Sequence, residues 1–118
     1  MAKSPKNGTA AGNGCLDQLF QIIDSRRGAD PQQSYTARLF AKGRLRMAKK
    51  VGEEATEVVI AALAEDKSRL ASESADLLYH LMVLWAANGV QPGDVWAELE
   101  RREGMSGYAL KAAQKNDA

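Results

Sequence analysis

KVGEEATE at residues 50–57 and ESADLLYH at residues 73–80 are the two stretches of this 118-residue chain that decide its fold. Each stretch carries a pair of acidic residues three positions apart, a spacing that places both side chains on one side of a helix. The paired acids are Glu54 with Glu57 and Glu73 with Asp76. Four carboxylates that face one another in a helical bundle repel strongly, and the usual compensation is a hard divalent cation.

Apolar periodicity predicts helices along the rest of the chain and no strand. The first expected helix lies around residues 16–23 and stops at Gly28, and the second is capped by Ser34 or Thr36 and meets a breaker at Gly43. Two long helices follow, one over 44–65 and one over 69–88 that is capped by Ser68. The last two run from Pro92 through Leu99 and, as a short helix, over 108–115. Residues 1–14 are small, polar and rich in glycine, so we expect a flexible leader to a single domain over 15–118. The chain is therefore predicted to be an all-α bundle of about four to five helices.

The long helix over 44–65 is expected to supply much of the core. Its core candidates are Leu45, Val51, Val58, Val59, Ala62 and Leu63. Gly52 lies inside this helix, where a glycine costs about 1 kcal/mol relative to alanine. Close packing of another helix, or the approach of a ligand, would offset that cost. Because the core of so small a chain is modest, the fold would gain from burying one face against a partner subunit.

Composition narrows the class of protein. The chain has 16 basic and 15 acidic residues and a net charge of +1, which gives no argument for nucleic acid or a membrane surface as a partner. The single cysteine, Cys15, excludes an intrachain disulfide and suits a reducing compartment. No stretch has the pattern of a secretory signal or of a membrane span, so a cytoplasmic location is expected.

The chemistry of the acids favours one kind of metal. An all-carboxylate set is typical of Mg2+ or Mn2+. A di-iron bundle needs Glu-x-x-His motifs, whereas the sole histidine, His80, follows Asp76 by four positions. An ordinary solvated charged face is the alternative interpretation of the two acidic stretches. His80 also has two interpretations, a hydrogen bond to Asp76 within the fold or a direct role in the site.

Basic residues lie on both sides of the acids. A guanidinium can grip a phosphate in bidentate fashion, and a Ser-Gly pair can offer backbone N–H groups. Candidates for phosphate binding are Arg101, Arg102, Ser106 and Gly107 after the acids, and Arg38, Lys42, Arg44 and Lys49 before them. Arginines near the end of a helix also interact favourably with its dipole, which explains their position equally well.

Four segments together resemble one known family. They are SYTARLF at 34–40, KVGEEATEVVIAA at 50–62, ESADLLYHL at 73–81 and RREGMSG at 101–107. They closely resemble the phosphoribosyl-ATP pyrophosphohydrolases, enzymes of histidine biosynthesis among the all-α, MazG-type nucleoside triphosphate pyrophosphohydrolases. The resemblance covers about residues 16–111.

This resemblance implies a set of site residues. The implied metal ligands are Glu54, Glu57, Glu73 and Asp76. Glu53 is implied to be an auxiliary acid, which binds the metal through water or acts as a base. The expected substrate-binding residues are Arg38, Lys42, Lys50, His80, Arg101, Arg102, Ser106 and Gly107.

The resemblance also implies a function and an assembly. The expected reaction is Mg2+-dependent hydrolysis of phosphoribosyl-ATP between its α- and β-phosphates, which gives phosphoribosyl-AMP and pyrophosphate, the second step of histidine biosynthesis. The expected assembly is a homodimer whose helices complete one another's bundle. Two alternatives stay open, a MazG-type enzyme that acts on another nucleotide and a non-catalytic helical interaction module.

Overall fold

The protein is all-α, as predicted, in a computed structural model that describes residues 8–64, 66–103 and 114. No strand is present in this described part of the chain. The helices are α1 (Gly8–Ser25), α2 (Tyr35–Lys42), α3 (Arg44–Ala64), α4 (Lys67–Ala87) and α5 (Pro92–Arg102). Within the same residues, no helix has both the length and the hydropathy that a membrane span requires.

Local sequence signals set most of the helix ends. The Ser34 hydroxyl accepts a hydrogen bond from the Ala37 amide at 3.1 Å and caps α2, and Gly43 ends that helix with a φ of 96°. Such a positive φ suits glycine and strains other residues. Pro92 begins α5, where the Gln91 amide donates to the Asp94 carboxylate at 2.9 Å. Of the two caps predicted for α2, Ser34 or Thr36, the structure uses Ser34, and the predicted break at Gly43 and start at Pro92 are confirmed.

The cap predicted for α4 was wrong by two residues. Asp66, and not Ser68, is the N-cap, because its carboxylate accepts from the Arg69 amide at 2.9 Å. Asp and Ser are nearly equal as N-caps, so the sequence alone did not discriminate between them.

Helix α1 begins at Gly8, inside the segment predicted to be a leader. Residues 1–7 and most of the predicted helix over 108–115 lie outside the described residues. The division into a leader and a domain over 15–118 therefore stays a prediction.

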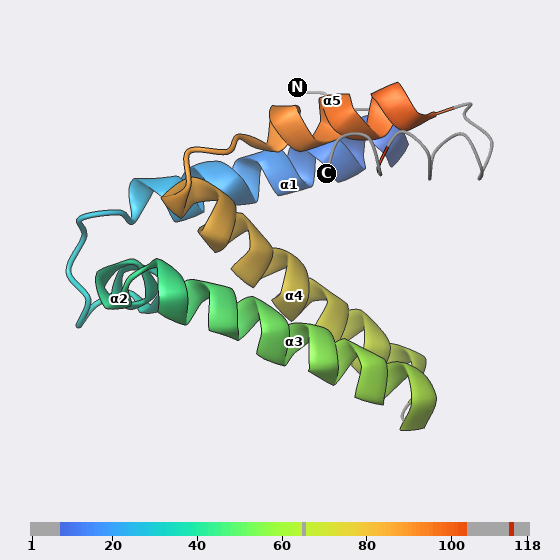
Figure 1. Ribbon diagram of the computed structural model, residues 1–118, viewed down its shortest axis with the longest axis horizontal. Helices are drawn as coiled ribbons and strands as arrows, with labels where there is room; N and C mark the ends of the chain where they lie inside the picture. The colour runs from blue at the N-terminus through green and yellow to red at the C-terminus, as the bar shows by residue number, and fades with distance from the viewer. Residues whose placement is uncertain (1–7, 65, 104–113, 115–118) are drawn as a thin grey trace.

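Figure 1 shows two pairs of helices that diverge from a common corner. Helices α3 and α4 run antiparallel along their lengths, and α1 pairs with α5. The C-terminal end of α4 reaches α1, and the short helix α2 lies across the start of α3. The acidic stretches 50–57 and 73–80 thus lie on the two helices of a single antiparallel pair.

The core lies at the corner where these elements meet. Its buried members are Phe20, Ile23, Leu39, Met47, Met82, Val83 and Ala86. Helix α3 contributes little to this core, since only Met47 and Ala61 are buried on it.

The core predicted for α3 was largely wrong. Leu45 and Leu63 are 77% and 84% exposed, and Val59 and Ala62 are exposed as well. The helix is apolar on two sides, and it packs against α4 through the side that holds Met47 and Ala61. The other apolar side is left uncovered by the described residues of this chain.

We expect Ser34→Ala to lower the free energy of unfolding by about 1 kcal/mol, because the substitution leaves the Ala37 amide without its capping partner. Ser34→Asp is the matched control and should retain most of the stability, since aspartate caps equally well. Denaturant titration followed by circular dichroism measures both. Equal stability of the alanine variant and the unmodified protein would show that this cap contributes nothing.

Candidate active site

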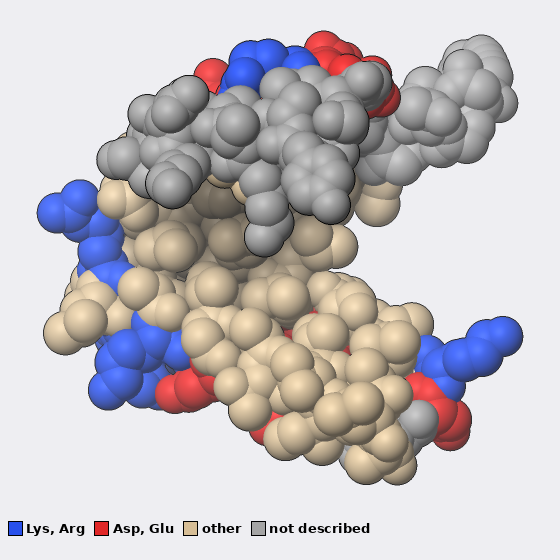
Figure 2. All heavy atoms as spheres, turned by 45° about the vertical axis from the view of Figure 1, so that its right-hand side comes forward, with Lys and Arg blue, Asp and Glu red and all other residues tan. Residues whose placement is uncertain are grey.

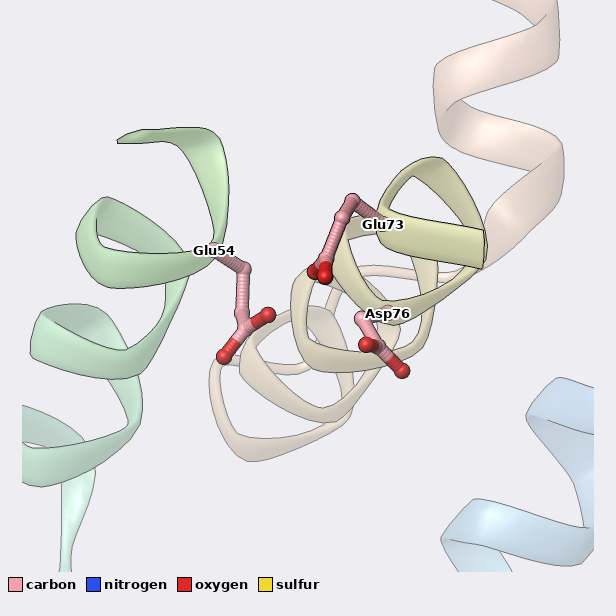
Figure 3. Close-up of side chains that lie close together, drawn as sticks. All are labelled: Glu54, Glu73 and Asp76. Atoms are coloured by element: carbon pink, nitrogen blue, oxygen red, sulfur yellow. The ribbon is translucent and has the colours of Figure 1, made fainter. Parts of the chain in front are cut away.

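The antiparallel pairing of α3 and α4 brings three of the predicted acids together. Carboxylate oxygens of Glu54, Glu73 and Asp76 all lie within 4.8 Å of one another. Figure 3 shows Glu54 reaching from α3 toward Glu73 and Asp76 on α4. We call these three residues the acid cluster. Their approach agrees with the spacing of the sequence, in which each helix presents its acids on one side.

Glu73 is the buried member of the acid cluster, with 7% of its surface exposed. Burial raises the pKa of its carboxyl group, and the negative charges of Asp76, Glu57 and Glu54 raise it further. Arg69, one turn earlier on α4, opposes this shift through an ion pair at 2.5 Å. The net rise of the pKa means that the folded chain disfavours the charged form of Glu73.

Glu57 is not one of the three converging acids. It is exposed on α3, although its charge still contributes to the raised pKa of Glu73. Its predicted role as a fourth metal ligand therefore stays a prediction.

Lys50 and Glu53 lie next to the acid cluster on α3. The Lys50 ammonium lies 3.3 Å from a carboxylate oxygen of Glu53 and 3.6 Å from one of Glu54. Burial lowers the pKa of Lys50, but the hydrogen bond to Glu53 and the nearby negative charges outweigh this effect and raise the pKa overall. Lys50 consequently stays charged at the edge of the acid cluster.

His80 is buried one turn beyond Asp76 on α4. Its Nδ1 lies 2.8 Å from the backbone carbonyl oxygen of Asp76, and its Nε2 lies 3.2 Å from the hydroxyl of Tyr35. The hydrogen bond to Asp76 that was one of the two interpretations of His80 is therefore present, and it is made to the backbone carbonyl oxygen of Asp76. Tyr35 is the site neighbour that sequence reasoning missed. It was visible only as part of the SYTARLF segment, and nothing local reveals a contact across 45 residues.

The basic candidates are spread over different parts of the fold. Arg38 lies on α2 and donates to the carbonyl oxygen of Pro31 at 3.4 Å, and Lys42 is exposed in the last turn of the same helix. Arg101 and Arg102 donate hydrogen bonds to Glu98 on α5 and lower the pKa of that carboxyl group to about 2. Ser106 and Gly107 lie outside the described residues.

The donor set of the acid cluster fits a hard cation. It consists of carboxylate oxygens alone, from residues that are buried, half-buried and exposed, so the cluster is anchored in the fold and still open to solvent. Hard divalent cations prefer such oxygen ligands, and the unfavourable charge on Glu73 is the kind that a bound cation relieves.

The fold and the acid cluster define an all-α protein whose paired helices present carboxylates to a shared site. The family model described as phosphoribosyl-ATP pyrophosphohydrolase matches residues 16–103. The chain belongs to this family, so the resemblance seen in the sequence is confirmed.

Curated relatives agree over most of the chain. A phosphoribosyl-ATP pyrophosphatase of Azospirillum brasilense is 57% identical over 101 residues, which are 86% of this chain and 91% of the relative. That of Paramagnetospirillum magneticum is 61% identical over 99 residues, 84% of this chain and 91% of the relative. That of Rhodospirillum rubrum is 58% identical over 100 residues, 85% and 86% of the two chains.

We expect Glu73→Gln to raise the melting temperature at neutral pH when a chelator removes divalent cations. A carboxyl group whose pKa is raised by folding favours the folded state at low pH, and that contribution is lost as the pH rises past the usual value near 4.5. Glutamine avoids the loss. The gain should therefore be present at pH 7, should shrink as the pH falls toward about 4.5, and should be absent below that value.

Glu100→Gln on α5 is the control for removal of one exposed negative charge. It should leave the melting temperature nearly unchanged at both pH values, since surface charges contribute little. A Glu73→Gln variant that is less stable than the unmodified protein at pH 7 would contradict the assignment of an unfavourable buried charge.

Proposed function

We propose that this protein hydrolyses phosphoribosyl-ATP to phosphoribosyl-AMP and pyrophosphate in a reaction that depends on Mg2+, with Mn2+ as a substitute. The observation that carries the proposal is the acid cluster, in which two antiparallel helices bring three carboxylates within 4.8 Å in a chain of the phosphoribosyl-ATP pyrophosphohydrolase family. A solvated charged face would not require one of its acids to be buried, as Glu73 is.

Glu54, Glu73 and Asp76 would hold the cation, and Glu57 would join them as a fourth ligand. When bound, the cation would supply positive charge that offsets the negative charge growing on the pyrophosphate leaving group. The buried Glu73 anchors the proposed ligands in the fold, while the exposed Asp76 leaves one side of the proposed cation site open to the phosphates of the substrate.

Glu53 and Lys50 have complementary roles at the edge of the acid cluster. The exposed carboxylate of Glu53 would accept a proton from the attacking water. Lys50 holds Glu53 and Glu54 by ion pairs at 3.3 and 3.6 Å, and so limits the directions in which these carboxylates point. Its ammonium group also offers a positive charge to the substrate phosphates.

The second ribose phosphate of the substrate needs a positive partner away from the acid cluster. Arg38 and Lys42 are the candidates on α2, the helix that also carries Tyr35. Arg101, Arg102, Ser106 and Gly107 complete the proposed set. Glu98 already neutralises part of the charge of the two arginines on α5.

The cytoplasmic location expected from the sequence stays a prediction.

The uncovered side of α3 supports a homodimer. Leu45, Val59, Ile60 and Leu63 are exposed and fall within an arc of about 100° on the helical wheel. We call this arc the outer face of α3. Figure 2 shows uncharged side chains over much of the limb formed by α3 and α4, with charged residues mostly at its edges and ends. A second copy of the chain would bury this face.

Gly52 leaves room on the outer face for another helix to approach the backbone of α3. It lies within the same arc, and a Cβ atom added to it would meet nothing within 4 Å. The close packing predicted for Gly52 is therefore absent within the described chain. The approach of a helix from a partner subunit would account for a residue that otherwise costs about 1 kcal/mol relative to alanine.

Hydrolysis itself is tested by the release of pyrophosphate. We expect the protein to release pyrophosphate from phosphoribosyl-ATP in preference to a panel of nucleoside triphosphates. Preference for another nucleotide would indicate a different MazG-type activity, and no release from any of them would favour a non-catalytic helical module.

We expect Glu54→Gln and Asp76→Asn to abolish pyrophosphate release at saturating Mg2+ while the helical content remains unchanged. Each substitution keeps the shape of the side chain and removes a charge that the cation needs. Glu100→Gln on α5 is the control and should retain activity. Turnover close to that of the unmodified protein in either cluster variant would refute the metal assignment.

The dimer is tested by two substitutions on the outer face of α3. Leu63→Glu places a charge in the proposed interface and should yield monomers at micromolar concentration in sedimentation experiments. Gly52→Ala distinguishes the two explanations of the glycine. Without a partner it should stabilise the helix by about 1 kcal/mol, whereas a closely packed partner helix would make the same substitution weaken the dimer. A stable monomer of the unmodified protein would refute the proposal.

A further inference from the structure

His80 has no ring nitrogen left for a ligand. Its Nδ1 lies 2.8 Å from the backbone carbonyl oxygen of Asp76, which can only accept, so Nδ1 carries the hydrogen. In the neutral imidazole, Nε2 is then an acceptor, and the Tyr35 hydroxyl at 3.2 Å must donate to it. Because His80 is also only 7% exposed, it offers no polar atom to a substrate.

Tyr35, in contrast to the buried His80, is accessible to a ligand. Its side chain belongs to a residue that is 47% exposed at the first position of α2. The ring stacks on Tyr79 with centroids 6.3 Å apart and meets His80 edge-on at 6.1 Å. Tyr79 is held in turn by a hydrogen bond between its hydroxyl and that of Thr36. The phenol of Tyr35 is therefore fixed by two neighbours, Tyr79 and His80, while much of the residue faces solvent.

Tyr35 is linked to the acid cluster through His80. One ring nitrogen of His80 lies 3.2 Å from the Tyr35 hydroxyl, and the other lies 2.8 Å from the backbone carbonyl oxygen of Asp76, one turn earlier on α4. A single side chain thus separates Tyr35 from an acid of the cluster. A nucleotide whose phosphates reach the cluster would extend past this residue.

We propose that Tyr35 is a substrate-contacting residue that receives the nucleoside part of the nucleotide, and that His80 is a positioning residue that acts through it. The hydroxyl hydrogen of Tyr35 is used by His80, so toward a ligand the phenolic oxygen only accepts. An acceptor disfavours phosphate oxygens and suits a ribose hydroxyl, while the exposed ring suits contact with a purine or a sugar. This inference rests on the proposed function.

The test uses Tyr35→Leu, Tyr35→Phe, His80→Gln and the double variant Tyr35→Phe/His80→Gln. Loss of the ring and hydroxyl in Tyr35→Leu should raise the KM for phosphoribosyl-ATP roughly 10-fold, and loss of the hydroxyl alone in Tyr35→Phe about 3-fold. The kcat should change little in either. His80→Gln should raise KM like Tyr35→Phe, and the double variant should be no worse than either single one, since coupled residues are not additive.

Tyr79→Phe is the matched control, because it removes one phenolic hydroxyl from the same aromatic group, and that hydroxyl bonds to Thr36 and not to His80. It loses the bond to Thr36 and should reduce stability while KM stays the same. Binding of Mn2+ without nucleotide, followed by electron paramagnetic resonance, should be equal in the unmodified protein and in every Tyr35 variant. A structural role for Tyr35 would instead reduce kcat and Mn2+ binding.

Calorimetric binding of phosphoribosyl-AMP separates this inference from the proposed function. A protein that binds this product but does not hydrolyse phosphoribosyl-ATP would refute the function, and the Tyr35 variants would still be compared by their binding. Product binding and KM in Tyr35→Leu within about twofold of the unmodified protein would overturn the role of Tyr35. Additive losses in the double variant would overturn the role of His80.

Discussion

The mutual repulsion of carboxylates between α3 and α4 is the constraint on which the rest of the structure depends. Glu73 is buried against α3, and the charges of Asp76, Glu57 and Glu54 add to the cost of ionising it. Arg69 offsets part of that cost through its ion pair with Glu73, and Lys50 pairs with Glu54 on the facing helix. Folding therefore holds the acids in an arrangement that gains most from a bound divalent cation.

Side-chain spacing within a single helix could be predicted from the sequence because it depends only on helical geometry. The three-residue spacing of the acids, the cap at Ser34, the break at Gly43 and the start at Pro92 all have local causes. The competition between Asp66 and Ser68 also has a local cause, but the two residues cap almost equally well. Local rules therefore predict these helix ends, with an error of two residues at the start of α4. They did not predict the start of α1, which begins at Gly8 inside the segment expected to be a leader.

Which side of a helix faces the core depends on the neighbouring helices, so the sequence did not predict it for α3. That helix is apolar around Met47 and Ala61 and again on its outer face, and only packing against α4 shows which side this chain buries. The link between Tyr35 and His80 has the same origin, because it joins residues 45 positions apart. Such features require the tertiary structure.

The availability of a charged or polar group for a ligand depends on the bonds that it already makes. Arg101 and Arg102 look like phosphate ligands in the sequence, yet both donate to Glu98, whose pKa falls to about 2 as a result. His80 looks like a catalytic or binding group, yet both of its ring nitrogens are engaged within the fold. Tyr35 drew attention in the sequence only as part of the SYTARLF segment, yet it is 47% exposed and its hydroxyl contacts His80. Since a ligand competes with existing partners, the groups whose capacity is least used within the fold are those best able to bind it.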